Sequence, residues 1–308
     1  MSHFPVTEAA LSGFTLLRRR PREVLIWAGV RLVMNFAMGA LVLVLGAQRL
    51  SQLQAISDTE ADVSLTQIGQ ALLSAWPLIA VLVPLSLVVQ TVLYAAIYRA
   101  WLRPEQDAGA YLRLGRDEFR LIGVTLLWML LFAGVLFAVT FIAGVIAALA
   151  DEALRPFAAV TGLVLFLGVL FVLLWAMVRL SLAWTATFAH RRIEVLRSWR
   201  LTRGRFWPLS GAYFVAFAVA LVAALAVLAA FAILAVTVAV ASGAGMAAAG
   251  QAFNPNATSL AAYFTVAMLG YLAMEALIST LTTVLLLTPT AEALRVLDAE
   301  AKPAASSA

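Results

Sequence analysis

The sequence has no cysteine, which excludes disulfide bonds, thiolate metal ligands and cysteine nucleophiles. Its two histidines, His3 and His190, lie far apart, and neither falls inside a long apolar run. Serine or zinc proteolysis within a membrane needs a histidine there, and a phosphate loop needs a Gly-rich motif that the sequence lacks. The sequence therefore predicts no catalytic residue, no metal site and no cofactor.

Charge is also scarce. Only 12% of the 308 residues are charged and 64% are hydrophobic, whereas about a quarter of a soluble domain is charged. Several apolar runs exceed the ~20 residues that a helix needs to cross a bilayer. We therefore predict an all-α polytopic membrane protein. Its six transmembrane helices would cover roughly 23–48, 70–98, 121–150, 157–189, 206–242 and 259–288.

Lysine occurs once, at Lys302, so the positive charge is carried by arginine. Seventeen of the 21 Lys and Arg residues lie before the first span, after the last span, or in the two segments 99–120 and 190–205. Because such residues favour the cytoplasmic side, we expect both termini in the cytoplasm. Arg18–Arg20 precede an apolar run that is too long for a signal peptide, so we expect a retained first span.

Two basic segments share a pattern. Residues 112–119 and 199–206 are identical at four of eight positions, and residues 14–21 match more loosely. We predict three units, about 7–98, 99–189 and 190–289, each a basic interfacial helix followed by a transmembrane hairpin. On this plan residues 1–21 form an amphipathic arm and 22–289 the membrane domain. Pro289 ends the last span, and 290–308 form a flexible tail.

The spacing within these segments suggests contact with lipid. On a continuous helix, residues seven apart share a face, which would place aromatic side chains in the acyl boundary and guanidinium groups at lipid phosphates. The segments would alternatively be ordinary cytoplasmic loops, whose charge needs no ligand. Nucleic acid is not expected as a partner, because the charge occurs in short loops beside spans. The predicted contacts with anionic lipid headgroups are Arg113, Arg116, Trp199, Arg200, Arg203 and Phe206.

One stretch carries a resemblance to a known family. Arg179-Leu-Ser-Leu-Ala, followed by Arg197-Ser-Trp-Arg-Leu-Thr-Arg-Gly-Arg-Phe-Trp207, resembles the repeat of the membrane domain attached to some glycerophosphoryl diester phosphodiesterases. YciC-like bacterial inner-membrane proteins share this repeat. The resemblance implies a six-span fold and an inner-membrane location. It implies no activity, because the sequence contains no phosphodiesterase domain.

Five of the polar residues inside the predicted spans are expected to lie close together. At 1.5 Å per residue, Arg31 lies about 15 Å from Pro21, where its helix is expected to start, and the others reach comparable depths. A lone charge there costs at least ~2.5–3.5 kcal/mol, so we expect Glu275 to pair with an arginine. Three interpretations stay open. Arg179 and Glu275 form a packing pair while the Arg31 side chain extends to the membrane interface; the polar residues form a pocket for an anionic group such as a lipid phosphate; or Glu275 relays protons. The predicted buried polar network is Arg31, Asn35, Gln90, Arg179 and Glu275.

We expect a non-enzymatic membrane protein that contacts anionic lipids and acts in lipid or envelope homeostasis. One alternative is a small transporter with a midplane site around Arg31, Arg179 and Glu275, since internal repeats with buried charge are common in transporters. Another is an assembly partner of a larger membrane complex. A protein partner or a homo-oligomer stays open.

Overall fold

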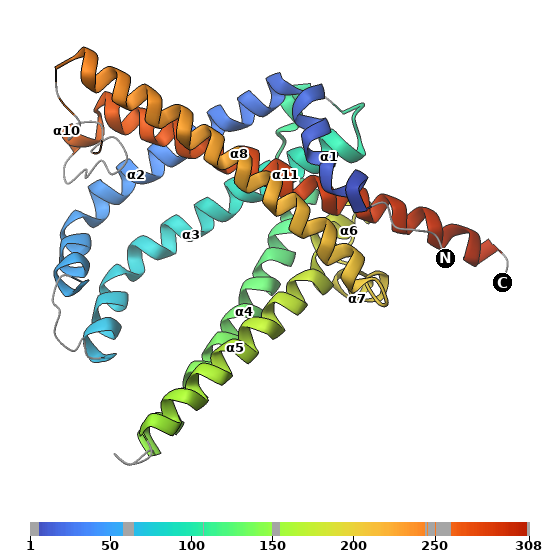
Figure 1. Ribbon diagram of the computed structural model, residues 1–308, viewed down its shortest axis with the longest axis horizontal. Coiled ribbons are helices and arrows are strands. Elements are labelled where there is room, and N and C mark those ends of the chain that lie inside the picture. Colours follow the sequence, from blue (N-terminus) through green and yellow to red (C-terminus); the bar gives the residue numbers. More distant parts are fainter. Residues whose placement is uncertain are drawn as a thin grey trace.

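The computed structural model of the chain describes residues 6–57, 65–106, 108–149, 155–243 and 260–306, together with Gly245 and Gly250. Every regular element in these ranges is helical (Figure 1). The elements are α1 (Val6–Arg19), α2 (Pro21–Ser57), α3 (Leu65–Leu102), the 3-10 helix η1 (Ala108–Tyr111), α4 (Arg116–Leu149), α5 (Arg155–Leu180), α6 (Ala183–His190), α7 (Val195–Leu201), α8 (Phe206–Ala241), α10 (Leu260–Tyr263) and α11 (Val266–Ser306).

Six helical stretches are long and apolar enough to cross a membrane, which confirms the predicted all-α polytopic fold. They are Pro21–Gly46, Leu73–Leu102, Gly109–Ile146, Val160–His190, Phe206–Ala241 and Val266–Ala299. Consecutive long helices form three hairpins, α2 with α3, α4 with α5, and α8 with α11. A short helix, α1, η1 or α7, precedes each hairpin.

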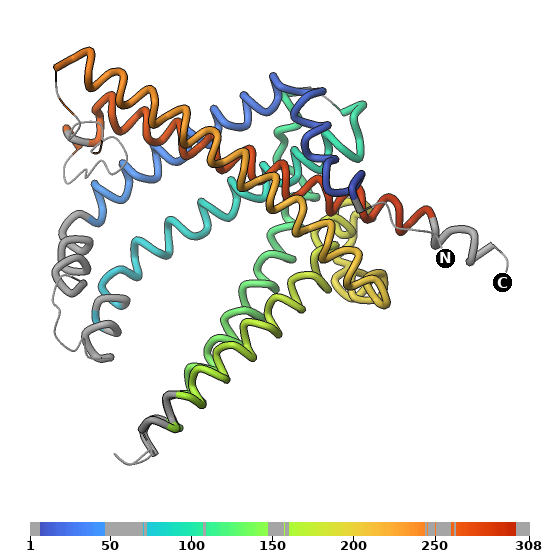
Figure 2. Tube along the Cα trace, viewed as in Figure 1, coloured from blue at the N-terminus to red at the C-terminus, as the bar shows by residue number. Residues whose placement is uncertain are grey.

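The three hairpins meet at one end of the molecule. Figure 1 shows α1, α6 and α7 gathered there, while the far ends of the hairpins point away and the α4–α5 hairpin diverges from the other two. We call this common end the hub. The trace in Figure 2 shows α8 and α11 side by side, and α11 also packs against α1, α2, α3 and α6. The last helix is therefore the central one.

Buried side chains concentrate at the hub. Trp27, Ile97 and Tyr111 belong to one apolar cluster, to which α1 and α11 contribute Leu16 and Val284. The indole Nε1 of Trp27 donates a hydrogen bond of 2.8 Å to the carbonyl of Ala110, so α2 is fixed to η1. In contrast, no residue in the most apolar stretch of α4 is buried within the protein. Such a long exposed apolar surface needs a hydrocarbon environment.

The N-terminal arm is packed rather than free. Ala9, Ala10 and Leu16 of α1 are buried, while Leu11 and Phe14 on its other face are exposed. Gly13 lies so close to α11 that a Cβ there would be 2.7 Å from the Cα of Leu285. The predicted amphipathic helix is therefore present, and its small residues form a close contact with the central helix.

The helices extend beyond the predicted spans. The apolar stretches Pro21–Gly46 and Leu73–Leu102 lie close to the predicted 23–48 and 70–98, but α2 continues to Ser57 and α3 already begins at Leu65. At the other end of the chain, Pro289 was expected to end the last span and to leave a flexible tail. Instead α11 continues through Pro289 to Ser306.

Tertiary contacts explain why α11 continues. Leu294 and Leu297 pack in a buried cluster with Leu182 and Leu209, so the stretch beyond the proline carries an apolar face of its own. Asp298 adds polar contacts, because its carboxylate lies 2.9 Å from Arg197 Nη2 and 3.1 Å from His190 Nε2. These contacts offset the backbone hydrogen bond that a proline removes.

The basic segments are not continuous interfacial helices, and this prediction is wrong. Residues 112–115 lie between η1 and α4, and α4 begins at Arg116. In the third unit α7 ends at Leu201, Gly204 has a φ of +78°, and α8 begins at Phe206. The seven-residue spacing therefore does not place Leu112 with Phe119, or Trp199 with Phe206, on one helix face. The shared pattern instead marks the turn into each hairpin.

Candidate functional site

The polar cluster around Arg31 joins three helices. Arg31 of α2 is 6% exposed, and its Nη2 donates a hydrogen bond of 3.0 Å to Gln90 Oε1 on α3. Its Nη1 donates to Ser279 and, at 3.4 Å, to Thr283, both on α11. Arg31 and Gln90, two members of the predicted network, are therefore in contact. The bond between Arg31 and Ser279 comes from the register of α11 against α2.

A cavity of about 140 Å³ adjoins this cluster, and Asn35, Glu275, Arg31 and Gln90 line it. The Glu275 side chain is exposed, and it attracts Arg31 electrostatically without a direct ion pair among the contacts of the described residues. The prediction that Glu275 is a buried partner of an arginine is therefore wrong. Glu275 is instead one of the residues that line the cavity.

Arg179 does not belong to the Arg31 cluster, which corrects the predicted five-residue network. Its guanidinium carbon lies 5.5 Å from the ring centroid of Trp175 and 5.6 Å from that of Trp199. Its backbone carbonyl accepts hydrogen bonds from Ser198 at 2.9 Å and Thr202 at 3.2 Å. Cation–π attraction to these two rings stabilises the guanidinium group, and Arg179 fixes α7 against the end of α5. Arg179 follows Trp175 by four residues, a spacing that makes two side chains neighbours on a helix, so the sequence could have indicated the contact with Trp175.

The six predicted lipid contacts divide into two groups. The guanidinium groups of Arg113, Arg116, Arg200 and Arg203 are all exposed. Trp199 is 39% exposed, because one side of its ring meets Trp175 edge-on at 4.9 Å, and Phe206 is partly buried. The arginines are therefore free to meet a charged surface, whereas Trp199 contributes mainly to packing.

Large apolar side chains are exposed beside these arginines. Leu114 and Phe119 are 65% and 64% exposed next to Arg113 and Arg116. In the third unit, Leu196 is 79% exposed and Trp207 is 81% exposed. Arginine beside exposed apolar surface is the composition of a membrane interface. The residue types predicted for lipid contact are therefore exposed at the surface, but they lie on turns and helix ends rather than on one face of a continuous helix.

Other arginines of the second basic segment face inward and were missed. Arg99 and Glu118 form a buried ion pair, with side chains 5% and 2% exposed. Arg99 also donates to the carbonyl of Tyr111 at 2.9 Å, and Glu118 accepts from the backbone N–H of Gly115 at 2.8 Å. Arg103 lies 3.4 Å from Asp117 and donates to the carbonyl of Phe188 at 3.1 Å. These contacts attach α3 to α4 and α6, so part of the basic charge holds the hub together.

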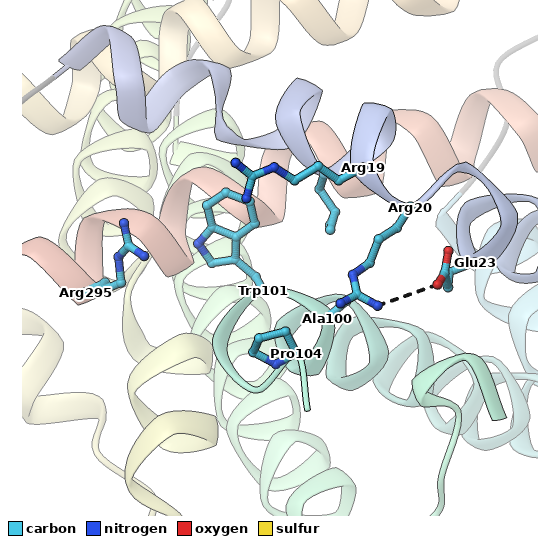
Figure 3. Close-up of a pocket in the computed structure, with 8 residues that line it drawn as sticks. Arg19, Arg20, Glu23, Ala100, Trp101, Pro104 and Arg295 are labelled. Atoms are coloured by element: carbon cyan, nitrogen blue, oxygen red, sulfur yellow. Dashed lines mark ion pairs between the residues drawn. The ribbon is translucent and has the colours of Figure 1, made fainter. Parts of the chain in front are cut away.

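A larger cavity, of about 390 Å³, lies at the hub between α1, α2, α3 and α11. Figure 3 shows that Arg19 and Arg295 flank the ring of Trp101, while Arg20 turns towards Glu23. The run Arg18–Arg20 was recognisable in the sequence as a basic arm, but nothing in the sequence indicated that Arg295, nearly 280 residues later, would join it. That juxtaposition depends on α11 continuing beyond Pro289.

Among the described residues, no group of three or more His, Asp or Glu side chains is placed to hold a metal ion. Comparison with family models, with curated proteins and with solved structures gave no match. The resemblance to the phosphodiesterase membrane domain stays a prediction that rests on the residues quoted for it.

Proposed function

We propose that this protein is a non-enzymatic inner-membrane protein that binds anionic lipid headgroups through the arginines of its hub and acts in lipid or envelope homeostasis. On this proposal the hub and both termini face the cytoplasm, where the positive-inside rule places basic segments. The anionic lipids of the inner leaflet would then lie against Arg113, Arg116, Arg200 and Arg203.

One observation carries the proposal. Exposed arginines and exposed large apolar side chains lie together at the entry to two hairpins, and α1 carries Leu11 and Phe14 exposed on the turns before its own arginines. A basic residue near an anionic surface contributes ~1 kcal/mol. The four arginines together would contribute up to ~4 kcal/mol, or roughly a thousandfold preference over neutral lipid.

Native mass spectrometry of the purified protein from mixed bilayers tests the proposal. The wild type should retain phosphatidylglycerol in preference to phosphatidylcholine. Replacing the four arginines by glutamine should abolish that preference, and replacing them by lysine should keep most of it, because both lysine and arginine attract anionic lipid as charges. Equal lipid retention by the glutamine variant and the wild type would contradict the proposal.

A transport function has one observation in its favour, the cavity that Arg31 and Glu275 line together. Arg179 was the third residue expected at that site, and it lies between Trp175 and Trp199 instead. Flux measurements in vesicles under a proton or solute gradient test this second function. Flux that Glu275→Gln abolishes would support it, and an absence of flux would contradict it.

A further inference from the structure

The hub cavity is a site that the proposed lipid contacts do not use. Its lining comes from the end of α1, the start of α2, the end of α3 and the extension of α11. These four stretches are distant in sequence, and the apolar cluster of Leu16, Trp27 and Val284 holds α1, α2 and α11 together beside them. The cavity is therefore part of the packed hub and does not depend on one mobile side chain.

Its lining carries an excess of positive charge. Three arginines, Arg19, Arg20 and Arg295, line the cavity with one carboxylate, Glu23, and Glu292 outside the lining pairs with Arg295. The Arg20–Glu23 pair is separated by 3.6 Å and is a quarter exposed, so it neutralises Arg20 only weakly. Arg19 is exposed and makes no ion pair with the described carboxylates. An anion in the cavity would therefore meet at least one uncompensated guanidinium group.

Two of the arginines are already oriented. The guanidinium of Arg20 lies 5.1 Å from the ring centroid of Tyr111, in addition to its contact with Glu23. Arg295 donates to Glu292 at 2.8 Å, and Glu292 also accepts from the indole of Trp101 at 3.1 Å. Each guanidinium has five N–H donors, so one such contact leaves others for a ligand. Orientation before binding lowers the entropy that a ligand must overcome.

Size and chemistry together indicate the ligand class. A cavity of about 390 Å³ falls in the range of small-molecule sites, roughly 300–1,000 Å³. Arginine is suited to phosphate oxygens, which it contacts with two parallel donors. Leu16, Trp101 and Pro104 supply an apolar wall for an organic group on the phosphate. We infer that the hub cavity binds a phosphate monoester dianion, as a lipid headgroup such as that of phosphatidic acid or as a soluble phosphate ester.

The inference goes beyond the proposed lipid contacts, because it uses different arginines and a more highly charged ligand. Isothermal titration calorimetry of the full-length protein in a non-ionic detergent tests it. The probes are glycerol 3-phosphate, dioctanoyl phosphatidic acid and, as a singly charged lipid, dioctanoyl phosphatidylglycerol. We expect phosphatidic acid to bind at least tenfold more tightly than phosphatidylglycerol. If glycerol 3-phosphate also binds, a soluble ester suffices; if it does not, the acyl chains are required.

The variants locate the site. Arg19→Gln with Arg295→Gln should weaken binding of the dianionic probe by about tenfold or more for each arginine removed, since hydrogen bonds to charged groups are strong. Arg22→Gln is the matched control, because Arg22 is exposed on the first turn of α2 and does not line the cavity. If the double variant does not fold, Arg19→Gln alone tests the site, because Arg19 is exposed and its replacement should not disturb folding.

Three outcomes would overturn the inference: no binding of either dianionic probe, equal affinity for phosphatidic acid and phosphatidylglycerol, or an equal loss in the Arg22 control. The experiments distinguish a failure of the cavity assignment from a failure of the proposed lipid contacts. The cavity variant should keep the phosphatidylglycerol preference measured by mass spectrometry, which depends on the exposed arginines near α4 and α8. A protein without that preference would still bind the dianionic probe if only the cavity assignment is correct.

Discussion

The buried ion pair between Arg99 and Glu118 predicts a large and specific loss of stability. Glu118→Gln keeps the size and shape of the side chain, and its amide oxygen still accepts from the N–H of Gly115. It removes the negative charge that faces Arg99, whose side chain is 5% exposed. The guanidinium group then remains buried with its hydrogen bond to the carbonyl of Tyr111 but without a counter-charge.

The expected cost follows from this burial. Removing one partner of a buried ion pair destabilises a protein by about 3–5 kcal/mol, because the remaining charge is desolvated and unpaired. The control is Glu23→Gln, which breaks the pair with Arg20. Both side chains of that pair are 25% exposed and 3.6 Å apart, so the expected cost is below about 1 kcal/mol. The two substitutions are chemically identical and differ in the burial of the pair.

The free energy of unfolding can be measured by titrating the detergent-solubilised protein with sodium dodecyl sulfate and following tryptophan fluorescence. Arg99→Met combined with Glu118→Gln should recover part of the loss, since the unpaired charge is then gone. If Glu118→Gln destabilises the protein no more than Glu23→Gln, the assignment of this pair as a buried element of the hub is refuted.

Two further predictions concern helix packing and the polar cluster. Gly13→Ala should lower the free energy of unfolding by about 1–3 kcal/mol and detach α1, because the new Cβ would meet the α11 backbone. Gly29→Ala is the control: a Cβ there has nothing within 4 Å, so the thermal midpoint should be unchanged or slightly raised. Equal midpoints for the two variants would contradict the close contact. In double-mutant cycles of unfolding free energy, Glu275→Gln should couple to Arg31→Gln by at least ~0.5 kcal/mol, and to Arg179→Gln by less than that. The reverse order would contradict the placement of Arg179 outside the Arg31 cluster.

Long apolar runs were sufficient to predict the six spans, because the need to satisfy backbone groups in hydrocarbon leaves a helix as the only spanning form for such a run. The depth of Arg31 and Gln90 followed from counting residues along two helices. Their contact is a consequence of similar depth on neighbouring spans. These features depend on local sequence and on the bilayer thickness.

The predictions that proved wrong concern positions where contacts between residues distant in sequence determine the structure. The matched pattern at 112–119 and 199–206 suggested helices, but Gly204 adopts a positive φ, and the chain turns there. Pro289 suggested a helix end, but buried Leu294 and Leu297 keep α11 continuous. Arg179 was expected to join the polar network around Arg31, but its guanidinium group lies beside two tryptophan rings instead. A single sequence does not show which distant residues will provide such contacts.

The central claim is that the arginine-bearing segments of all three units lie on one face of the membrane. Because the chain has no cysteine, single-cysteine variants can report each side without background. Leu114 and Leu196 are exposed positions in the second and third units, and Ser242 is exposed directly after the last residue of α8. With a membrane-impermeant maleimide, we expect Ser242→Cys to be labelled in intact spheroplasts, and Leu114→Cys and Leu196→Cys to be labelled only in inverted vesicles. Labelling of Leu114→Cys and Leu196→Cys from opposite sides would contradict the claim.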